Sequence, residues 1–401
     1  MMEMKVLIVG AGLGGLRTAE ALRSNGFSGE IVIVGDESHQ PYNRPPLSKE
    51  ALYSGLSHED LKFRQRDSVA DVSWVLGSAA EKLDLAEQKV ILADGTSRAF
   101  DALVVSTGIR PRLLPIPGPT QGLFTLRTLN DAQSLQAAIG PGVNVVILGS
   151  GFIGCELAAT ATTLGANVHV VSLDIEPMVI PMGVDLGAAM RKRHETKGVT
   201  FHLGHTVEKF NGDHRIESVT LDSGEVITAS VVIEAVGSVP NTQWLHDNGL
   251  HLDDGVLVDS NMRALGAQIP IYAVGDISNH PNKFYGDRTR RIEHWNMPTE
   301  TGKRAGAALA AELAGRDLPA DEFFALPAFW SDQYEFQLQS YGLPGAGASH
   351  RVASGALDGA CIVEYFDEAG VLCGVIGIDT VKELLPYRTQ FMAAKSWEPN
   401  R

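Results

Sequence analysis

The sequence predicts an α/β protein in which one βαβ unit occurs twice and a separate α+β domain follows. A short apolar run leads into a glycine-rich turn at residues 10–15, and the same pattern returns at residues 149–154. A strand, a tight turn, a helix and a second strand in this order are typical of parallel sheets. After about Asp321 the pattern changes to aromatic segments and β-rich runs at residues 361–366 and 371–378, which predict the last domain.

The composition is that of a globular protein with enough apolar material for several cores. The chain has 401 residues, of which 44% are hydrophobic and 20% are charged. At roughly 100–200 residues per domain, this length predicts about two to four domains. The formal net charge of −15 argues against nucleic acid and anionic membranes as partners.

Cysteine usage and the N-terminus predict a protein of the reducing cytoplasm. Cys155, Cys361 and Cys373 lie far apart and form no CxxC pair, which argues against a disulfide framework and against zinc or iron–sulfur ligation, and we expect no metal site. No run approaches the roughly 18 consecutive apolar residues of a membrane span. The N-terminus lacks the basic and long apolar regions of a signal peptide and runs directly into a strand at residues 5–9.

The first glycine-rich turn has the GxGxxG pattern of dinucleotide-binding domains. Its first glycine makes the tight turn, its second lets a pyrophosphate approach the backbone, and its third allows the helix to pack closely on the strand. The pyrophosphate then lies at the positive N-terminus of a helix predicted over residues 15–25. The turn consists of Gly10, Ala11, Gly12, Leu13, Gly14 and Gly15.

The second strand of this unit, predicted at residues 31–34, ends beside two acidic residues. Asp36 stands where such domains place an acceptor for a ribose hydroxyl, and Glu37 is the neighbouring candidate. A lone GxGxxG is a weak signal, but here strand, turn, helix, strand and acid agree. We therefore expect a dinucleotide site in the first unit.

The second unit repeats the fingerprint but ends its strand differently. Strands are predicted at residues 144–148 and 168–172, with a helix over residues 155–164 between them. The last strand ends at Ser172, Asp174 follows, and no Arg or Lys stands close by to bind a 2′-phosphate. This pattern favours NADH and leaves NADPH open. The turn contributes Gly149, Gly151, Phe152, Ile153 and Gly154.

Two correctly placed fingerprints in one chain predict two Rossmann-like domains and two bound dinucleotides. The simplest chemistry for such a pair is electron transfer between a flavin and a nicotinamide. Further buried strands are predicted at residues 101–108, 231–237 and 271–276. The first of these leads into a Pro-rich stretch that marks a domain crossover.

With these motifs the sequence resembles the ferredoxin reductases of bacterial oxygenase systems, which have the glutathione-reductase fold and serve Rieske dioxygenases or cytochrome monooxygenases. The resemblance covers essentially the whole chain, and PYNRPPLSK at 41–49 and FWSDQ at 329–333 are its most specific motifs. The other motifs are GAGLGG at 10–15, VVSTGIRPR at 104–112, LRTLNDA at 126–132, GSGFIGCE at 149–156, GSVPNT at 237–242, IYAVGDI at 271–277 and RIEHW at 291–295.

The resemblance implies FAD in the first domain and assigns residues to it. Arg44 and Lys49 would reach the flavin from a proline-stiffened loop, whereas the residues alone favour solvated cations on a surface loop. Ala80 would present its backbone to the adenine. Thr107 and Gly108 would close the domain over FAD.

Three further residues follow from the same resemblance. Arg127 would contact FAD from the crossover, and Asp276 would bind the ribityl chain or the pyrophosphate. The alternative for Asp276 is a cap on the next helix. Gly237, in GSVPNT, belongs to the nicotinamide side.

The implied catalytic residues are Lys49 and Glu156, which would pair beside the flavin and the nicotinamide. The cation favours an anionic reduced flavin, and the carboxylate limits the cost of burying the cation. Glu293 and Trp295 would flank the nicotinamide and the flavin pyrimidine. Trp330 would lie near the isoalloxazine where electrons leave, or serve as a core aromatic of the last domain.

The lack of a redox-active cysteine pair affects which electron acceptor we expect. Related disulfide reductases carry a redox-active cysteine pair after the FAD strand, but residues 43–52 contain no cysteine. We interpret Cys155, inside the second fingerprint helix, as a packing residue rather than a reactive thiol. Electrons are therefore expected to leave the flavin directly for an external acceptor.

The resulting hypothesis is that NADH reduces FAD, which passes single electrons to an acidic [2Fe–2S] ferredoxin in aromatic hydrocarbon catabolism. A basic run after Asp287 would dock that ferredoxin through Arg288, Arg290 and Arg291. A second cluster, formed by Lys62, Arg64 and Arg66, is more simply explained as solvated charge.

Three rival functions share this fold: a rubredoxin reductase, an NADH-binding flavoprotein similar to apoptosis-inducing factor, and a monodehydroascorbate-type reductase. The expected domains are residues 1–112 with 241–322 for FAD, 113–240 for NAD(P)H and 323–401 for the C-terminal α+β domain. The sequence leaves open whether the protein is a monomer or a homodimer.

Overall fold

The first lobe is built on a five-stranded parallel sheet in the computed structural model, which describes residues 4–286 and 288–395. A parallel sheet is covered on both faces, and its central strand is accordingly apolar along its length. The strand order is β19 (Ile271–Ala273), β7 (Ala102–Val105), β1 (Lys5–Val9), β2 (Glu30–Val34) and β3 (Ser73–Val75). Because β19 pairs with β7, segments on both sides of the middle of the chain build one sheet.

Two helices pack against each other on this sheet and fix the first glycine-rich turn. Helix α1 (Leu13–Ser24) begins two residues before the predicted start, because the turn itself already adopts helical geometry. Helix α8 (Met297–Leu313) approaches it closely, since a Cβ at Gly306 would lie 2.5 Å from the Cβ of Ala21. Glycines at such positions let two helix backbones come together.

The second lobe repeats the parallel sheet. Its order is β12 (Thr200–Leu203), β11 (Asn167–Ser172), β10 (Asn144–Leu148), β16 (Val231–Glu234) and β9 (Leu123–Phe124). Strand β16 ends three residues before the predicted strand end, and β19 likewise ends at Ala273, so both predicted strands were too long. The helices of this lobe are α4 (Leu129–Ala138), α5 (Phe152–Thr163), α6 (Val179–Met182) and α7 (Val184–Thr196).

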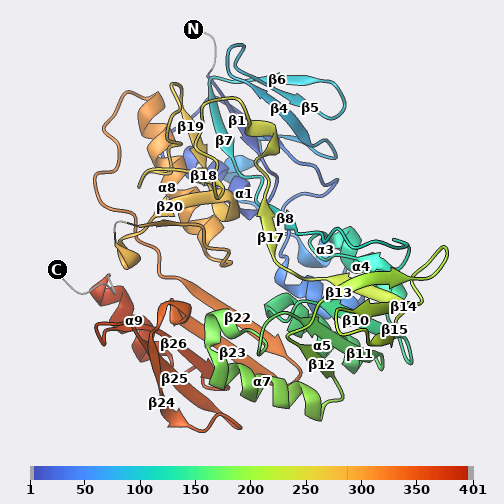
Figure 1. The fold of residues 1–401 in the computed structure, drawn as a ribbon. Helices are drawn as coiled ribbons and strands as arrows, with labels where there is room; N and C mark the ends of the chain where they lie inside the picture. Colours follow the sequence, from blue (N-terminus) through green and yellow to red (C-terminus); the bar gives the residue numbers. More distant parts are fainter. Residues whose placement is uncertain (1–3, 287, 396–401) are drawn as a thin grey trace.

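The duplication extends beyond the fingerprints, because each lobe also carries a three-stranded antiparallel sheet. In the first lobe it consists of β4 (Ala80–Asp84), β5 (Lys89–Leu92) and β6 (Ser97–Ala99). In the second lobe it consists of β13 (Val207–Asn211), β14 (Ser218–Leu221) and β15 (Val226–Thr228). Figure 1 shows the two small sheets projecting from the two lobes.

The two connections between the lobes pair with each other. Strand β8 (Ile109–Pro111) runs antiparallel to β17 (Ser238–Pro240). Beside them the Asn241 side chain donates to the Thr107 carbonyl at 2.9 Å, and the Thr107 hydroxyl donates to the Asn241 carbonyl at 3.0 Å. These bonds fasten the outgoing and returning chain together and so restrict how the lobes can move.

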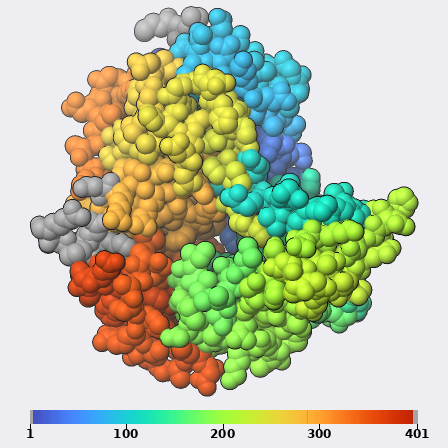
Figure 2. Space-filling view, viewed as in Figure 1, coloured from blue at the N-terminus to red at the C-terminus, as the bar shows by residue number. Residues whose placement is uncertain are grey.

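The last lobe is an antiparallel sheet, and the runs predicted near residues 361–366 and 371–378 are two of its strands. The order is β22 (Ala328–Gln333), β23 (Phe336–Gly342), β26 (Leu372–Ile378), β25 (Cys361–Phe366) and β24 (Ser349–Gly355). Helix α9 (Leu385–Ala394) follows it. In Figure 1 this red lobe lies beside the green helix α7, and Figure 2 shows the two lower lobes side by side below the first lobe.

Short elements complete the first lobe. They are α2 (Glu50–Ser54), α3 (His58–Leu61), β18 (Val256–Leu257), β20 (Ser278–Pro281) and β21 (Thr289–Arg290). In the described residues no helix combines the length and apolar character needed to cross a membrane.

The buried His280 makes the stability of the fold depend on pH. Its side chain is 0% exposed, and burial lowers its pKa to about 4, against about 6.5 in an unfolded chain. Between pH 6.5 and 4, His280 is protonated in the unfolded state but not in the folded state. The stability that is present above pH 6.5 is therefore lost as the pH falls toward 4.

When the pH is lowered from 7 to 4.5, we therefore expect the free energy of unfolding of His280→Asn to fall by about 2–3 kcal/mol less than that of the wild type. Urea unfolding of the holoprotein at a series of pH values measures this difference. An identical pH dependence of the two proteins would contradict the buried neutral histidine.

Candidate functional site

A cavity of about 990 Å³ lies where the three lobes meet. That volume is at the upper end for ligand pockets. The first lobe supplies most of its wall, including the first glycine-rich turn. The middle lobe adds Phe152, Ile153 and Glu156, and the last lobe adds Phe329 and Trp330.

The glycines of the first turn have the three steric roles that their pattern predicts. A Cβ at Gly10 would lie 2.1 Å from the Ser106 carbonyl oxygen, and one at Gly15 would lie 2.3 Å from the Gly10 carbonyl oxygen. A Cβ at Gly12 would meet nothing within 4 Å. The backbone at Gly12 is therefore left open toward the cavity, which Leu13 and Gly14 also line.

The second turn has the same steric pattern but lies outside the cavity wall. A Cβ at Gly149 would lie 2.4 Å from the Ala235 carbonyl oxygen, and one at Gly154 would lie 2.1 Å from the Gly149 carbonyl oxygen. Gly151 again faces open space. The second turn thus presents a separate surface, and Phe152 and Ile153 connect it to the cavity.

The polar groups at the end of strand β11, beyond the second turn, hydrogen-bond to one another. Ser172 is buried, and its hydroxyl accepts from Ser150 Oγ at 2.9 Å and from the Asp174 backbone N–H at 3.2 Å. Glu176 is bound by Arg191 at 2.8 Å. Gly237 has a φ of +94° and immediately precedes β17. Neither Ser172 nor Gly237 belongs to the cavity wall.

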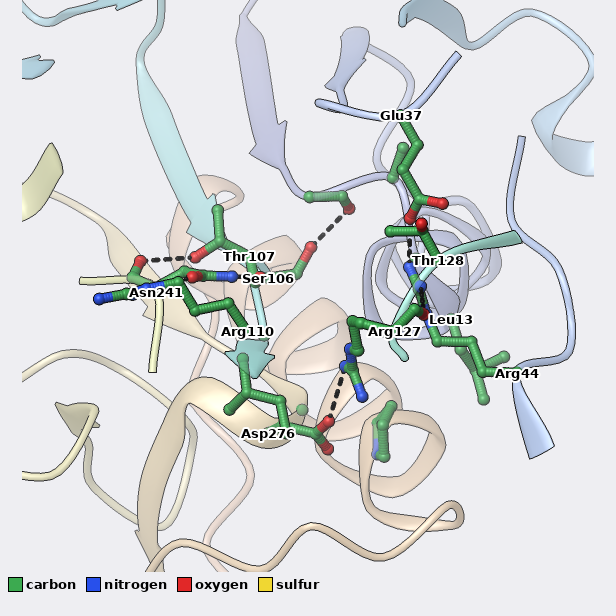
Figure 3. Close-up of a pocket in the computed structure, with 18 of the residues that line it drawn as sticks. Leu13, Glu37, Arg44, Ser106, Thr107, Arg110, Arg127, Thr128, Asn241 and Asp276 are labelled. Carbon is green, nitrogen blue, oxygen red and sulfur yellow. Dashed lines mark hydrogen bonds and ion pairs between the residues drawn. The ribbon is translucent and has the colours of Figure 1, made fainter. Parts of the chain in front are cut away.

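An ion pair lies inside the cavity wall. Arg127 Nη2 stands 3.1 Å from Asp276 Oδ2, and Figure 3 shows the two side chains facing each other. Burial raises the pKa of Asp276, and the charge of Arg127 opposes that rise. Asp276 lies in a short 3₁₀ turn, Gly275–Ile277, and not on the strand that was predicted to end there. Its side chain thereby turns into the cavity.

Asp36 and Glu37, the two predicted acceptors for a ribose hydroxyl, both line the cavity but have different surroundings. Glu37 accepts from Arg44 at 2.5 Å and from the Tyr42 hydroxyl at 2.6 Å. Arg44 also donates to the Arg127 carbonyl at 2.6 Å. Asp36 lines the cavity and is exposed. The sequence interpretation assigned no role to Tyr42, although this residue lies in the PYNRPPLSK motif at 41–49.

Lys49 and Glu156 form the pair that the family resemblance implied. Lys49 Nζ lies 2.7 Å from Glu156 Oε2, and their side chains are only 10% and 8% exposed. Two residues not anticipated from sequence also donate to this carboxylate: Ser48 Oγ at 2.5 Å and Ser331 Oγ at 2.7 Å. The Pro45 carbonyl accepts from Lys49 at 3.0 Å.

Aromatic side chains form the outer edge of the cavity. Trp295 and Trp330 meet edge to face with ring centroids 5.7 Å apart, and they are 41% and 40% exposed. The alternative of Trp330 as a core aromatic is therefore wrong. Phe152 and Phe329 lie 4.8 Å apart at their ring centroids. Ala80, at the start of β4, and the Thr107–Gly108 pair also line the cavity.

The predicted basic docking run does not form one continuous patch. Arg291 is paired with Asp254 at 2.9 Å and with Glu293, and it is only 12% exposed. Arg290 lies over the Tyr285 ring at 5.6 Å, whereas Arg288 is exposed. The structure thus removes Arg291 from the patch. Asp287 lies outside the described residues.

Two other predicted features have simple structural explanations. Lys62 pairs with Glu59 at 2.5 Å and Arg66 lies 3.5 Å from Glu20, so the second basic cluster is largely compensated. Cys155 is fully buried, and burial raises the pKa of its thiol. A buried thiol of raised pKa is unreactive. Among the described residues there is no cluster suited to a metal ion.

The cavity wall carries buried polar atoms that need a ligand. Ser78 Oγ, Trp244 Nε1 and His294 Nδ1 are buried, line the cavity and have no hydrogen-bond partner among the described residues. Buried polar groups of native proteins almost always have partners. With the open backbone at Gly12 and the exposed carboxylate of Asp36, these atoms fit a large polar cofactor such as a dinucleotide.

The fold and this site define a protein with two dinucleotide-binding lobes that share one cavity. Residues 4–302 match the family described as pyridine nucleotide-disulphide oxidoreductase, and residues 328–401 match the reductase C-terminal domain. The chain is 36% identical over 359 residues to rhodocoxin reductase of Rhodococcus erythropolis, covering 88% of this chain and 82% of that protein.

Further relatives agree. The chain is 32% identical over 386 residues to the ferredoxin–NAD(+) reductase subunit of the benzene 1,2-dioxygenase system of Pseudomonas putida, covering 95% of this chain and 91% of that protein. The covalent putidaredoxin reductase–putidaredoxin complex matches with a TM-score of 0.88 at 30% identity, covering 98% of this chain and 93% of that chain.

The chain belongs to the pyridine nucleotide-disulphide oxidoreductase family and, within it, to the ferredoxin reductases. The fold class predicted from sequence is confirmed, and FAD with NAD(P)H are the cofactors of this family.

The open position at Gly12 yields a test. Gly12→Val would place a side chain in empty space, so the apoprotein should keep its fold and lose FAD. Gly15→Ala would drive its Cβ into the Gly10 carbonyl and should destabilise the apoprotein itself. Flavin content after purification and thermal unfolding of the apoproteins distinguish the two variants. FAD retention by Gly12→Val at the wild-type level would refute the assignment.

Proposed function

We propose that this chain is an NADH-dependent reductase that transfers electrons through FAD to an acidic [2Fe–2S] ferredoxin of an oxygenase system. The observation that carries this proposal is the single cavity in which the FAD lobe, the second dinucleotide lobe and the exposed tryptophans meet. When bound, FAD accepts a hydride from the nicotinamide and releases its electrons singly.

The residues of the first lobe would hold FAD. The backbone at Gly12 and the N-terminus of α1 offer N–H groups and a positive end to the pyrophosphate. Asp36, or Glu37 beside it, would accept from a ribose hydroxyl, and Ala80 would present its backbone to the adenine. Arg127, paired with Asp276, would contact the cofactor from the crossover.

The second lobe would bind NADH. Gly149, Gly151 and Gly154 reproduce the steric pattern of the first turn, which supports a second pyrophosphate site. The strand end at Ser172 offers Asp174 as the nearest carboxylate, and Glu176 neutralises Arg191. This charge pattern supports NADH over NADPH, since a 2′-phosphate needs an unpaired cation.

Lys49 and Glu156 would stand at the reacting edge of the flavin. The ammonium stabilises negative charge that develops there, and the carboxylate keeps the ammonium in one position. Glu293 and Trp295, which also line the cavity, would flank the bound rings. None of these groups has to exchange a proton during the reaction.

Electrons would leave past Trp330. All three cysteines are buried and unpaired, so no dithiol is placed to receive them from the cavity. Arg288 and Arg290 precede the Glu293–Trp295 segment in the chain, and we propose them as the docking cations for an acidic ferredoxin.

We also propose that the protein is cytoplasmic and is a monomer or homodimer. The proposed domain boundaries fall after residues 112, 240 and 322.

The function is tested by coupling NADH oxidation to cytochrome c reduction through a panel of bacterial [2Fe–2S] ferredoxins, with ferricyanide as a small acceptor. We expect the holoenzyme to reduce both acceptors with NADH and to use NADPH poorly. Arg288→Glu should lower ferredoxin reduction about tenfold through weaker association and leave ferricyanide reduction unchanged.

Lys209→Glu, on the remote strand β13, is the matched charge reversal and should change neither activity. Equal loss of both activities in Arg288→Glu would contradict the docking assignment. If no ferredoxin stimulates cytochrome c reduction, the proposed acceptor is wrong.

A further inference from the structure

A continuous chain of buried hydrogen bonds runs from the middle lobe through the last lobe to Glu156. His194 Nε2 on α7 lies 2.7 Å from Gln333 Oε1, and Gln333 Nε2 donates to Ser331 Oγ at 3.0 Å. Ser331 Oγ then donates to Glu156 Oε1 at 2.7 Å. His194 and Ser331 are 0% exposed and Gln333 is 1% exposed.

The donors of this chain all point toward Glu156. An amide oxygen only accepts, so His194 Nε2 must carry the proton in its bond to Gln333. Burial lowers the pKa of His194 to about 4, so its ring is neutral near pH 7. Because Ser331 Oγ accepts from Gln333, its single proton is directed to the carboxylate.

The opposite oxygen of Glu156 is held from the first lobe. Ser48 Oγ donates to Oε2 at 2.5 Å, and Lys49 Nζ lies 2.7 Å from the same atom. Glu156 itself belongs to the middle lobe. The last lobe reaches this carboxylate through Ser331, so the three lobes converge on one charged group.

The geometry of β22 explains why Ser331 and Gln333 act together. Side chains alternate between the faces of a strand, so residues two apart share a face. Ser331 and Gln333 are buried on one face, whereas Trp330 is exposed on the other face. The FWSDQ motif therefore places an aromatic residue at the cavity edge and two polar residues behind Glu156.

We propose that Ser331, oriented by Gln333, is a positioning residue that keeps the Glu156 carboxylate directed at Lys49. This inference rests on the proposed function, since it concerns the charge pair beside FAD. A hydrogen bond to a buried charge contributes more than one between neutral groups, and its loss leaves part of the charge unpaired.

Ser331→Ala tests the proposal in the FAD-loaded protein. Without the hydroxyl dipole, the negative charge of Glu156 acts more fully on the cavity. We expect a more negative flavin midpoint potential at pH 8 and about tenfold slower flavin reduction by NADH. Gln333→Leu should shift both quantities in the same direction by a smaller amount, because Ser331 then loses its orienting donor.

Ser340→Ala is the matched control. Ser340 lies on β23 of the same sheet, is 0% exposed, and its hydroxyl has no hydrogen-bond partner among the described residues. The substitution removes the same atom from the same sheet and should leave the potential and the reduction rate unchanged.

A double-mutant cycle separates positioning from packing. In a Glu156→Gln background there is no charge to hold, so Ser331→Ala should change the reduction rate by less than about twofold and leave the potential unchanged. An equal loss in both backgrounds, or no change of potential in Ser331→Ala alone, would overturn the proposal. A wild-type holoenzyme that NADH does not reduce would instead refute the proposed function.

Discussion

The buried ion pair between Lys49 and Glu156 joins the first lobe to the middle lobe, and the last lobe contacts it through Ser331. Removing two charges from water costs several kcal/mol, which their mutual attraction offsets only if further hydrogen bonds satisfy them. Here Ser48 and Pro45 supply those bonds from the first lobe and Ser331 supplies one from the last lobe. Residues of all three lobes thus contribute to satisfying the pair.

The duplicated lobes explain how one cavity can serve two dinucleotides. Each lobe contains a parallel sheet, a glycine-rich turn and a small antiparallel sheet, but only the first turn opens into the cavity. The glycines of the second turn lie outside the cavity wall, and residues of α5 connect that turn to the cavity. Strand β8 pairs with β17, and Thr107 is hydrogen-bonded to Asn241. These contacts keep the two lobes, and hence the two turns, in fixed relative positions.

Much of this architecture could be predicted from sequence, because glycine turns and apolar strands are local patterns. The roles of Gly10, Gly12 and Gly15 follow from spacing alone. Contacts between distant segments could not be predicted in this way. Asp254 forms an ion pair with Arg291, and both Tyr42 and Arg44 donate to Glu37. Ser331 contacts Glu156 because the last lobe packs against the middle lobe.

The most direct test of the ion pair is the rate at which NADH bleaches the flavin of Lys49→Met holoenzyme under anaerobic conditions. The new side chain is also unbranched, is one heavy atom shorter and carries no charge. If the ammonium stabilises charge at the flavin edge, flavin reduction should slow about 100-fold while the FAD content stays at the wild-type level. A variant that retains FAD and is reduced at the wild-type rate would contradict the account.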